Sequence, residues 1–124
     1  MWGETRSGIS TSLLKDRLLV TLQGDLTGDI MERLQTEVLG LLQSHGLKMV
    51  VFDVSAVDVI DLEEFAAMQG VASMARFLGA VPVLIGLQPG VVAFLAGAGM
   101  DTSDLITARG LQDVDRVVTL RMST

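Results

Sequence analysis

The apolar run at residues 47–54 constrains the fold more than any other stretch of this sequence. Only Lys48 and Asp53 interrupt its hydrophobic residues. A near-continuous run of this kind is typical of a strand that is buried on both faces, at the centre of a parallel or mixed sheet. Such a strand requires helices over the sheet, so we expect an α/β fold.

Extended and helical patterns alternate along the rest of the chain. We expect strands at residues 9–14, 17–23, 47–54, 81–87 and 104–107, and helices at residues 29–45, 62–78, 89–98 and 111–120. The order ββαβαβαβα predicts a sheet with helices packed on it and right-handed crossovers. We expect one domain at residues 9–120, between a flexible tail at 1–8 and a short tail at 121–124.

The composition excludes several classes of function. The chain has 124 residues, of which 49% are hydrophobic, so it can bury a single core. It contains no cysteine, which removes disulfides, thiolate chemistry and cysteine metal sites. Its net charge of -6 makes nucleic acids and anionic membranes poor partners, because few cations are present to replace their counterions.

Residues 77–100 carry no charge and are together long enough to span a bilayer. Glycine and proline interrupt this segment repeatedly, so we expect a strand, a turn and a helix inside a water-soluble core. The N-terminus lacks the apolar region of a signal peptide. We therefore expect no membrane insertion and a location in the cytoplasm.

The ends of the helices also carry sequence signals. Thr27 or Gly28 can cap the first helix, and Gly46 can end it. In the third helix Pro89 fits the first position, and residues 91–96 are all small or apolar. A helix of this composition is either buried on most sides or covered by a partner.

Acidic residues gather directly after the buried strand, where ligands and partners meet an open α/β sheet. A phosphorylated Asp53 would need an acid pair after the first strand and a nearby lysine, and the early loop offers only Asp25. Phosphatases with a nucleophilic aspartate need a second acid two residues later, where this chain has Ser55. We therefore expect no phosphoryl-transfer site.

The remaining acids also lack the partners that catalysis requires. Four carboxylates could form acid–base pairs, namely Asp58, Asp61, Glu63 and Glu64. No histidine, arginine clamp or aromatic cleft accompanies them, so we expect neither an enzyme nor a metal site or cofactor. Asp61 and Glu64 instead fit a capping box at the start of the second helix. The turn Gln88–Pro89–Gly90 opens the third helix, and its amides alone are weak support for an anion site.

The sequence resembles the STAS domains of the anti-sigma-factor antagonist family over about residues 10–120. Three pieces carry the resemblance: residues 50–61 before the second helix, residues 77–80 before a strand, and residues 86–89 with the helix that ends at 98–100. The Gln88–Pro89 turn is most similar to the single-domain scaffold of the stressosome. The resemblance implies a mixed sheet of four or five strands with about four helices, no catalysis, and function through protein–protein binding.

In that family a serine or threonine begins the second helix and accepts a phosphate from a kinase. In this sequence the position is occupied by Leu62, and no hydroxyl lies between Asp61 and Ser73. The resemblance therefore implies that the usual switch is absent. Whether Asp61, Glu63 and Glu64 mimic the phosphorylated state stays open, and Ser55 is the nearest alternative acceptor.

We expect a signalling module whose partner-binding surface consists of the loop after the buried strand, the start of the second helix and the Gln88–Pro89 turn. Its expected residues are Asp53, Ser55, Asp58, Asp61, Leu62, Glu63, Glu64, Gln88 and Pro89. The partners would be an anti-sigma factor or switch kinase and other STAS proteins, and the apolar third helix allows homo-oligomers. The alternatives are a STAS subunit of a lipid or other transporter that binds an ATPase, and a small-molecule or nucleotide-binding sensor.

Overall fold

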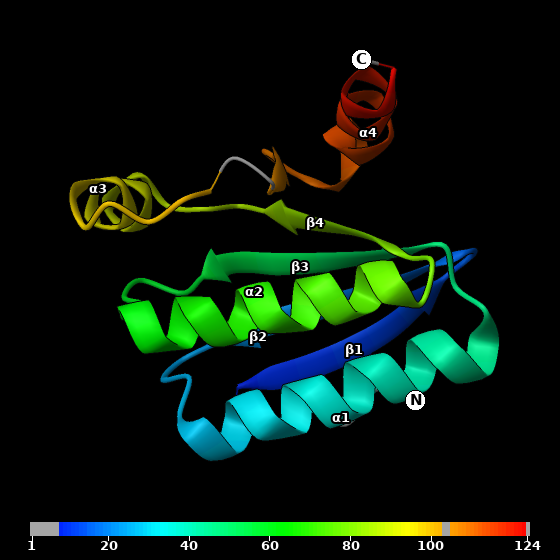
Figure 1. The fold of residues 1–124 in the computed structure, drawn as a ribbon, viewed down its shortest axis with the longest axis horizontal. Coiled ribbons are helices and arrows are strands. Elements are labelled where there is room, and N and C mark those ends of the chain that lie inside the picture. The colour runs from blue at the N-terminus through cyan, green and yellow to red at the C-terminus, as the bar shows by residue number, and fades with distance from the viewer. Residues whose placement is uncertain (1–7, 103–104, 124) are drawn as a thin grey trace.

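The computed structural model describes residues 8–102 and 105–123, in which a five-stranded sheet carries helices on both faces (Figure 1). The strands are β1 (Ile9–Leu14), β2 (Arg17–Gln23), β3 (Met49–Ala56), β4 (Val81–Ile85) and β5 (Ile106–Ala108). The helices are α1 (Gly28–His45), α2 (Leu62–Phe77), α3 (Pro89–Gly97) and α4 (Val114–Met122), and a 3-10 turn, η1 (Leu111–Asp113), precedes α4. The predicted element order and the mixed α/β sheet are confirmed.

The strands lie side by side in the order in which they occur in the chain, β1-β2-β3-β4-β5. β1 is antiparallel to β2, and the other neighbouring pairs are parallel. Because the sheet grows in one direction, right-handed crossovers place successive connecting helices on the same side. Figure 1 shows α1 and α2 next to each other on one face, with α4 apart from them beyond β4.

β3 is buried on both faces, as the apolar run at 47–54 predicts. Val50 and Phe52 belong to the larger core, which also contains buried residues from α1, α2 and α3. Met49 and Val51 point the opposite way, into a smaller core that includes Val114 of α4. The alternation of side chains along one strand thus joins both layers of the molecule.

The register of the parallel strands brings their carboxyl ends to one edge of the sheet. Thr21 pairs with Asp53, Asp53 with Ile85, and Ile85 with Ala108. The segments that leave at this edge, residues 24–27, 57–61, 86–88 and 109–110, define what we call the carboxyl edge. The loops after β2, β3 and β4 lie on the left in Figure 1. Residues 15–16, 46–48 and 78–80 lie at the opposite, amino edge.

α4 is tied to the start of β2 by an ion pair. Arg17 Nη2 donates to Asp115 Oδ1 at 2.8 Å, and Arg17 Nε contacts Asp16 Oδ1 at 3.2 Å. The hydrogen bond from Arg17 lowers the pKa of Asp115, because it stabilises the ionised carboxylate. The same bond raises the pKa of Arg17.

The local helix signals are confirmed where the structure tests them. Thr27 Oγ1 accepts a hydrogen bond from Ile30 N at 3.4 Å and is the N-cap of α1. Gly46 ends α1 in the left-handed conformation, with φ of 59°. Residues 77–100 contain β4 and α3 as separate elements, as the glycine and proline pattern predicts. No helix within the described residues is both long and apolar enough to cross a bilayer.

Several predicted boundaries were wrong. β4 ends at Ile85 rather than at 87, because Gly86 leaves the strand with a φ of +77°. β5 covers Ile106–Ala108 instead of 104–107, and Asp104 lies outside the described residues. α4 continues to Met122, past the expected end at 120. Residues 1–7 of the expected tail are not described, but Gly8 belongs to the fold, since its carbonyl accepts from Gln23 N at 3.2 Å.

The exposure of α3 bears on the two alternatives that its composition left open, burial on most sides or contact with a partner. Val91 and Leu95 are buried against the larger core. Val92 and Phe94 flank this buried stripe on its two sides and are each about half exposed. α3 is therefore not buried on most sides and presents an apolar face to the surroundings.

Candidate functional site

Two buried side chains hold the loop between β3 and α2 against the core. Val57 and Ile60 are buried in the larger core and anchor it from below. Between them, Asp58 is exposed and Val59 is 79% exposed. The two buried residues thus fix the backbone of the loop, and the two residues between them present one acidic and one apolar side chain outward.

Asp53 and Ser55 form a local turn at the start of this loop. Asp53 Oδ1 accepts from Ser55 N at 3.0 Å and from Ser55 Oγ at 2.7 Å. Both donors satisfy one carboxylate oxygen, so Asp53 shapes the backbone here. This arrangement gives Asp53 a structural role, and it occupies the hydroxyl of Ser55.

The capping box predicted for α2 is present. Asp61 Oδ1 accepts from Glu64 N at 2.7 Å, and Glu64 Oε1 accepts from Asp61 N at 2.8 Å. Two backbone donors at the helix start are satisfied in this way. Leu62, the first residue of α2, is 41% exposed, and Glu63 beside it is exposed.

Gln88 joins the loop to the turn before α3. Its Nε2 donates to the carbonyl of Ser55 at 2.8 Å and to Asp58 Oδ1 at 2.9 Å. Pro89 follows as the first residue of α3 and is exposed. The structure therefore brings the two predicted parts of the surface together. The sequence indicated the turn but not this bridge, because no local pattern shows a hydrogen bond between residues thirty or more positions apart.

Gly86 allows the close approach of these two segments. A Cβ at this position would lie 2.7 Å from the Cβ of Ser55 and 3.1 Å from its backbone nitrogen. The positive φ of Gly86 also disfavours any other residue. β3 and β4 can thus end in contact with each other.

The sequence did not show that the start of α1 also borders this site. A groove of about 420 Å³ separates the starts of α1 and α2. Its lining includes Leu26, Thr27, Gly28, Met31, Asp61, Glu63, Glu64 and Ala67. The parallel pairing of β2 and β3 places the loops after both strands at the carboxyl edge, and this pairing is what brings the start of α1 to the site.

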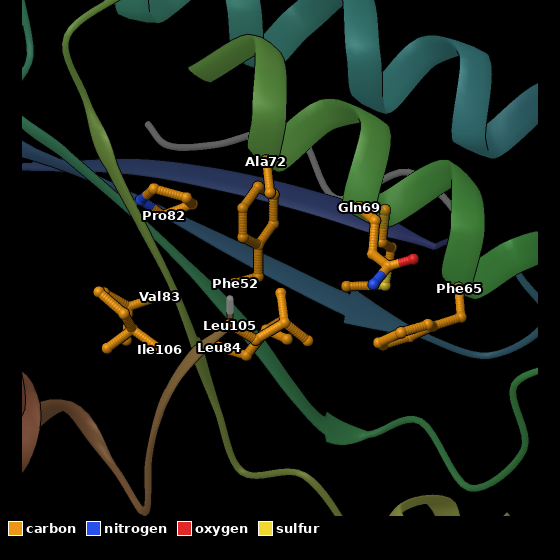
Figure 2. Close-up of a pocket in the computed structure, with 10 residues that line it drawn as sticks. Phe52, Phe65, Gln69, Ala72, Pro82, Val83, Leu84, Leu105 and Ile106 are labelled. Carbon is orange, nitrogen blue, oxygen red and sulfur yellow. The ribbon is translucent and has the colours of Figure 1, made fainter. Parts of the chain in front are cut away.

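Two further hollows bear on the alternative of a small-molecule or nucleotide-binding sensor. The pocket in Figure 2 lies between α2 and the strands, where Phe52 extends towards Ala72. It has about 10 Å³ of free space, enough for roughly one water. A larger groove of about 440 Å³ lies between α3 and β5, lined by apolar side chains with Thr102 and Thr107. Among the residues that the structure describes, no basic side chain lines either hollow, whereas a phosphate-binding site ordinarily uses basic side chains or helix amides.

No group of three or more potential metal-ligating side chains occurs within residues 8–102 and 105–123. The carboxylates at the carboxyl edge are instead engaged in loop and cap bonds or point outward. The arrangement can therefore present a shaped, acidic surface to a partner.

The family model of the STAS domain matches residues 6–114. The chain belongs to the STAS family. The resemblance seen in the sequence is thus confirmed over most of the chain, and no curated protein matches it by sequence.

Solved STAS structures share the fold over nearly the whole chain. A serine-to-glutamate variant of RsbS from Moorella thermoacetica is 26% identical, with a TM-score of 0.75, covering 92% of this chain and 97% of that one. A chain from the stressosome, described as a signal integration and transduction hub, is also 26% identical with a TM-score of 0.75, covering 90% and 97%. The unphosphorylated anti-sigma factor antagonist SpoIIAA is 12% identical, with a TM-score of 0.70 and coverage of 90% and 96%, and supports the fold alone. The family match and the two structures at 26% identity support a role in signalling through protein interaction.

Proposed function

We propose that this STAS domain is a non-enzymatic binding module of bacterial signalling. Its contact surface, which we call the loop surface, consists of residues 53–61, the first turn of α2, and Gln88 with Pro89. The bond network of Gln88 carries the proposal, because it makes one rigid unit of two segments that are distant in sequence. Val59 and Leu62 provide exposed apolar area within this unit, and carboxylates surround them.

In our proposal, binding through the loop surface is constitutive, because Leu62 occupies the position that a phosphorylation switch would use. A phosphate at the first residue of a helix would meet free backbone amides and the positive end of the dipole. Leu62 cannot accept one, and the charges of Asp61 and Glu64 are engaged in the capping box. Glu63 then supplies the fixed negative charge in this turn, with fewer acceptor oxygens than a phosphate.

Ser55 is a poor replacement acceptor in the observed geometry. Its hydroxyl lies 2.7 Å from the carboxylate of Asp53. A phosphate on Ser55 would be repelled by that carboxylate and would lose this hydrogen bond. The loop therefore favours the unmodified serine.

The test is a phosphorylation assay with a serine kinase of the switch class and ATP. We expect no phosphate on residues 55–80 of the natural chain, whereas Leu62→Ser should gain one phosphate per chain. Leu62→Ala is the matched control, because it shortens the side chain without adding a hydroxyl. Tryptic mass spectrometry reads all three. Phosphopeptides from residues 55–80 of the natural chain would contradict the proposal, and an unmodified Leu62→Ser chain would remove the role assigned to this position.

The proposed partners are an anti-sigma factor or switch kinase and other STAS proteins. A pull-down with the natural chain and with Val59→Lys identifies what binds the loop surface, since a partner of this surface should be lost with the variant. Recovery of a transporter ATPase instead would support the transporter alternative. The expected cytoplasmic location stays a prediction.

A further inference from the structure

The two edges of the sheet carry opposite charge. Seven carboxylates lie in the loops of the carboxyl edge or in the ends of the strand and helices that adjoin them, namely those of Asp25, Asp29, Asp53, Asp58, Asp61, Glu63 and Glu64. Arg109 is the cationic residue that directly follows a strand at this edge. A surface of this kind attracts a basic partner surface and repels a second acidic one.

The amino edge is basic. Lys15 lies in the turn between β1 and β2, and Lys48 immediately precedes β3. Backbone bonds hold these segments together, from Lys48 N to the carbonyl of Asp16 and from Val81 N to the carbonyl of Lys48, each at 2.9 Å. Among the described residues of this region, Asp16 and Asp115 both pair with Arg17. After Arg17, Lys15 also lowers the pKa of Asp115 through its charge. Three cations, those of Lys15, Arg17 and Lys48, thus face two acids in this region, and a net positive charge remains.

The end of α2 adds apolar area to the amino edge. Phe77 is 90% exposed, and Met74 and Leu78 are each about two-fifths exposed. Spacings of three and four residues place these side chains on one side of the helix end. An aromatic side chain with this exposure next to two other exposed apolar residues marks an interaction surface. We call Lys15, Lys48, Met74, Phe77 and Leu78 the tail patch.

We infer that the tail patch of one copy docks on the loop surface of a second copy, head to tail. Each surface combines exposed apolar side chains with a net charge, and the two net charges are opposite in sign. Contact between two loop surfaces would oppose acids to acids, and contact between two tail patches would oppose lysines to lysines. The charges thus favour a heterologous contact over a symmetric one. The inference uses the loop surface of the proposed function and names a second copy as one of its partners.

Two charge-reversed variants test this arrangement. The head variant, Val59→Lys with Glu63→Lys, changes the loop surface and leaves the capping box and the Gln88 bonds in place. The tail variant, Lys48→Glu with Phe77→Glu, changes exposed side chains of the tail patch. Light scattering after gel filtration and analytical ultracentrifugation give the mass of each chain alone and of an equimolar mixture.

We expect the mass of the natural chain to rise with concentration above that of one chain. Each variant alone should stay monomeric, with association weakened at least tenfold. The mixture should form heteromers, because one intact loop surface and one intact tail patch remain. Gln35→Lys on α1 and Leu120→Glu on α4 are controls with similar changes at other exposed positions, and both should associate like the natural chain.

Three results would overturn the inference: a monomeric natural chain at every concentration, a variant that associates alone like the natural chain, or a mixture without heteromers. Heteromer formation also shows that both variants are folded. A natural chain that stays monomeric but retains its pull-down partners would reject this inference and leave the proposed function standing. Loss of those partners in the Leu120→Glu control would count against the proposed function instead.

Discussion

Gly86 is the single residue on which the joint between β3 and β4 depends most directly. It combines a left-handed backbone with contact to Ser55, and each condition alone disfavours a side chain at this position. The bonds of Gln88 to the same loop can form only while this approach is kept. One glycine thus determines whether the loop surface is a unit.

We expect Gly86→Ala to lower the free energy of unfolding by about 1–3 kcal/mol, because it adds backbone strain and a clash. Urea denaturation followed by circular dichroism measures the change. Gly90→Ala is the matched control, since a Cβ there meets nothing within 4 Å and its backbone is helical. The control should keep or slightly raise stability. An equal loss in both variants would show that the contact with Ser55 has no special cost.

The capping box was predictable from sequence, whereas the Gln88 bridge was not. Asp61 and Glu64 are three residues apart, and the backbone of a helix start brings such residues into contact wherever it forms. Gln88 meets Asp58 only because the register of β3 and β4 aligns two distant segments. Residue roles that depend on local geometry can therefore be inferred before the fold is known, and roles that depend on register cannot.

At the scale of elements, α4 is attached to the sheet by a small core and by the Arg17–Asp115 ion pair. Val114 is its fully buried side chain, and Val117 and Val118 are partly buried. The ion pair connects this late helix to a strand close to the start of the fold. Loss of the pair should therefore loosen α4 more than the rest of the molecule.

We expect Asp115→Asn to lower the melting temperature slightly at about pH 7, where the natural carboxylate is ionised and paired. The folded pKa of Asp115 is depressed, so its contribution is present above the unfolded value of about 3.9 and is lost as pH falls through the folded pKa. The gap between the two chains should therefore close in acid. Melting curves across this range measure it, with Asp25→Asn as an exposed control. A gap that persists below about pH 2 would assign the effect to packing.

The bounds of β5 and the burial of α3 could not be predicted from the sequence pattern, whereas the longer elements could. The strong strands and long helices were predicted with small errors at their ends. β5 was placed about two residues too early, because three residues give too few side chains to show a period of two. The apolar composition of α3 could not distinguish burial from partner contact, since that depends on what surrounds the helix rather than on the helix itself.

At the scale of the whole molecule, stability should fall from the centre of the sheet towards β5. β3 is flanked by strands on both sides and buried on both faces. β5 has three residues, pairs with β4 alone, and is covered by α4 through the smaller core. Edge elements with few buried contacts open more easily than central ones.

We expect amide hydrogen exchange to be slowest in β2 and β3 and at least tenfold faster in β5 and α4. Exchange measured by mass spectrometry on peptic fragments resolves these segments. α1 is the internal comparison, because it is also a surface helix but packs on the larger core through five buried side chains. Equal protection of α4 and α1 would show that the domain opens as one unit.

The order of the strands has a consequence for how the domain is made. Each strand pairs with the one that precedes it in the chain, so no later strand has to enter between two that are already paired. Contacts between neighbours in sequence lower the entropy lost in closing loops, which favours fast folding. On the ribosome the sheet can therefore lengthen one strand at a time as the chain emerges. β5 and α4 would then join last, onto a sheet that is already in place.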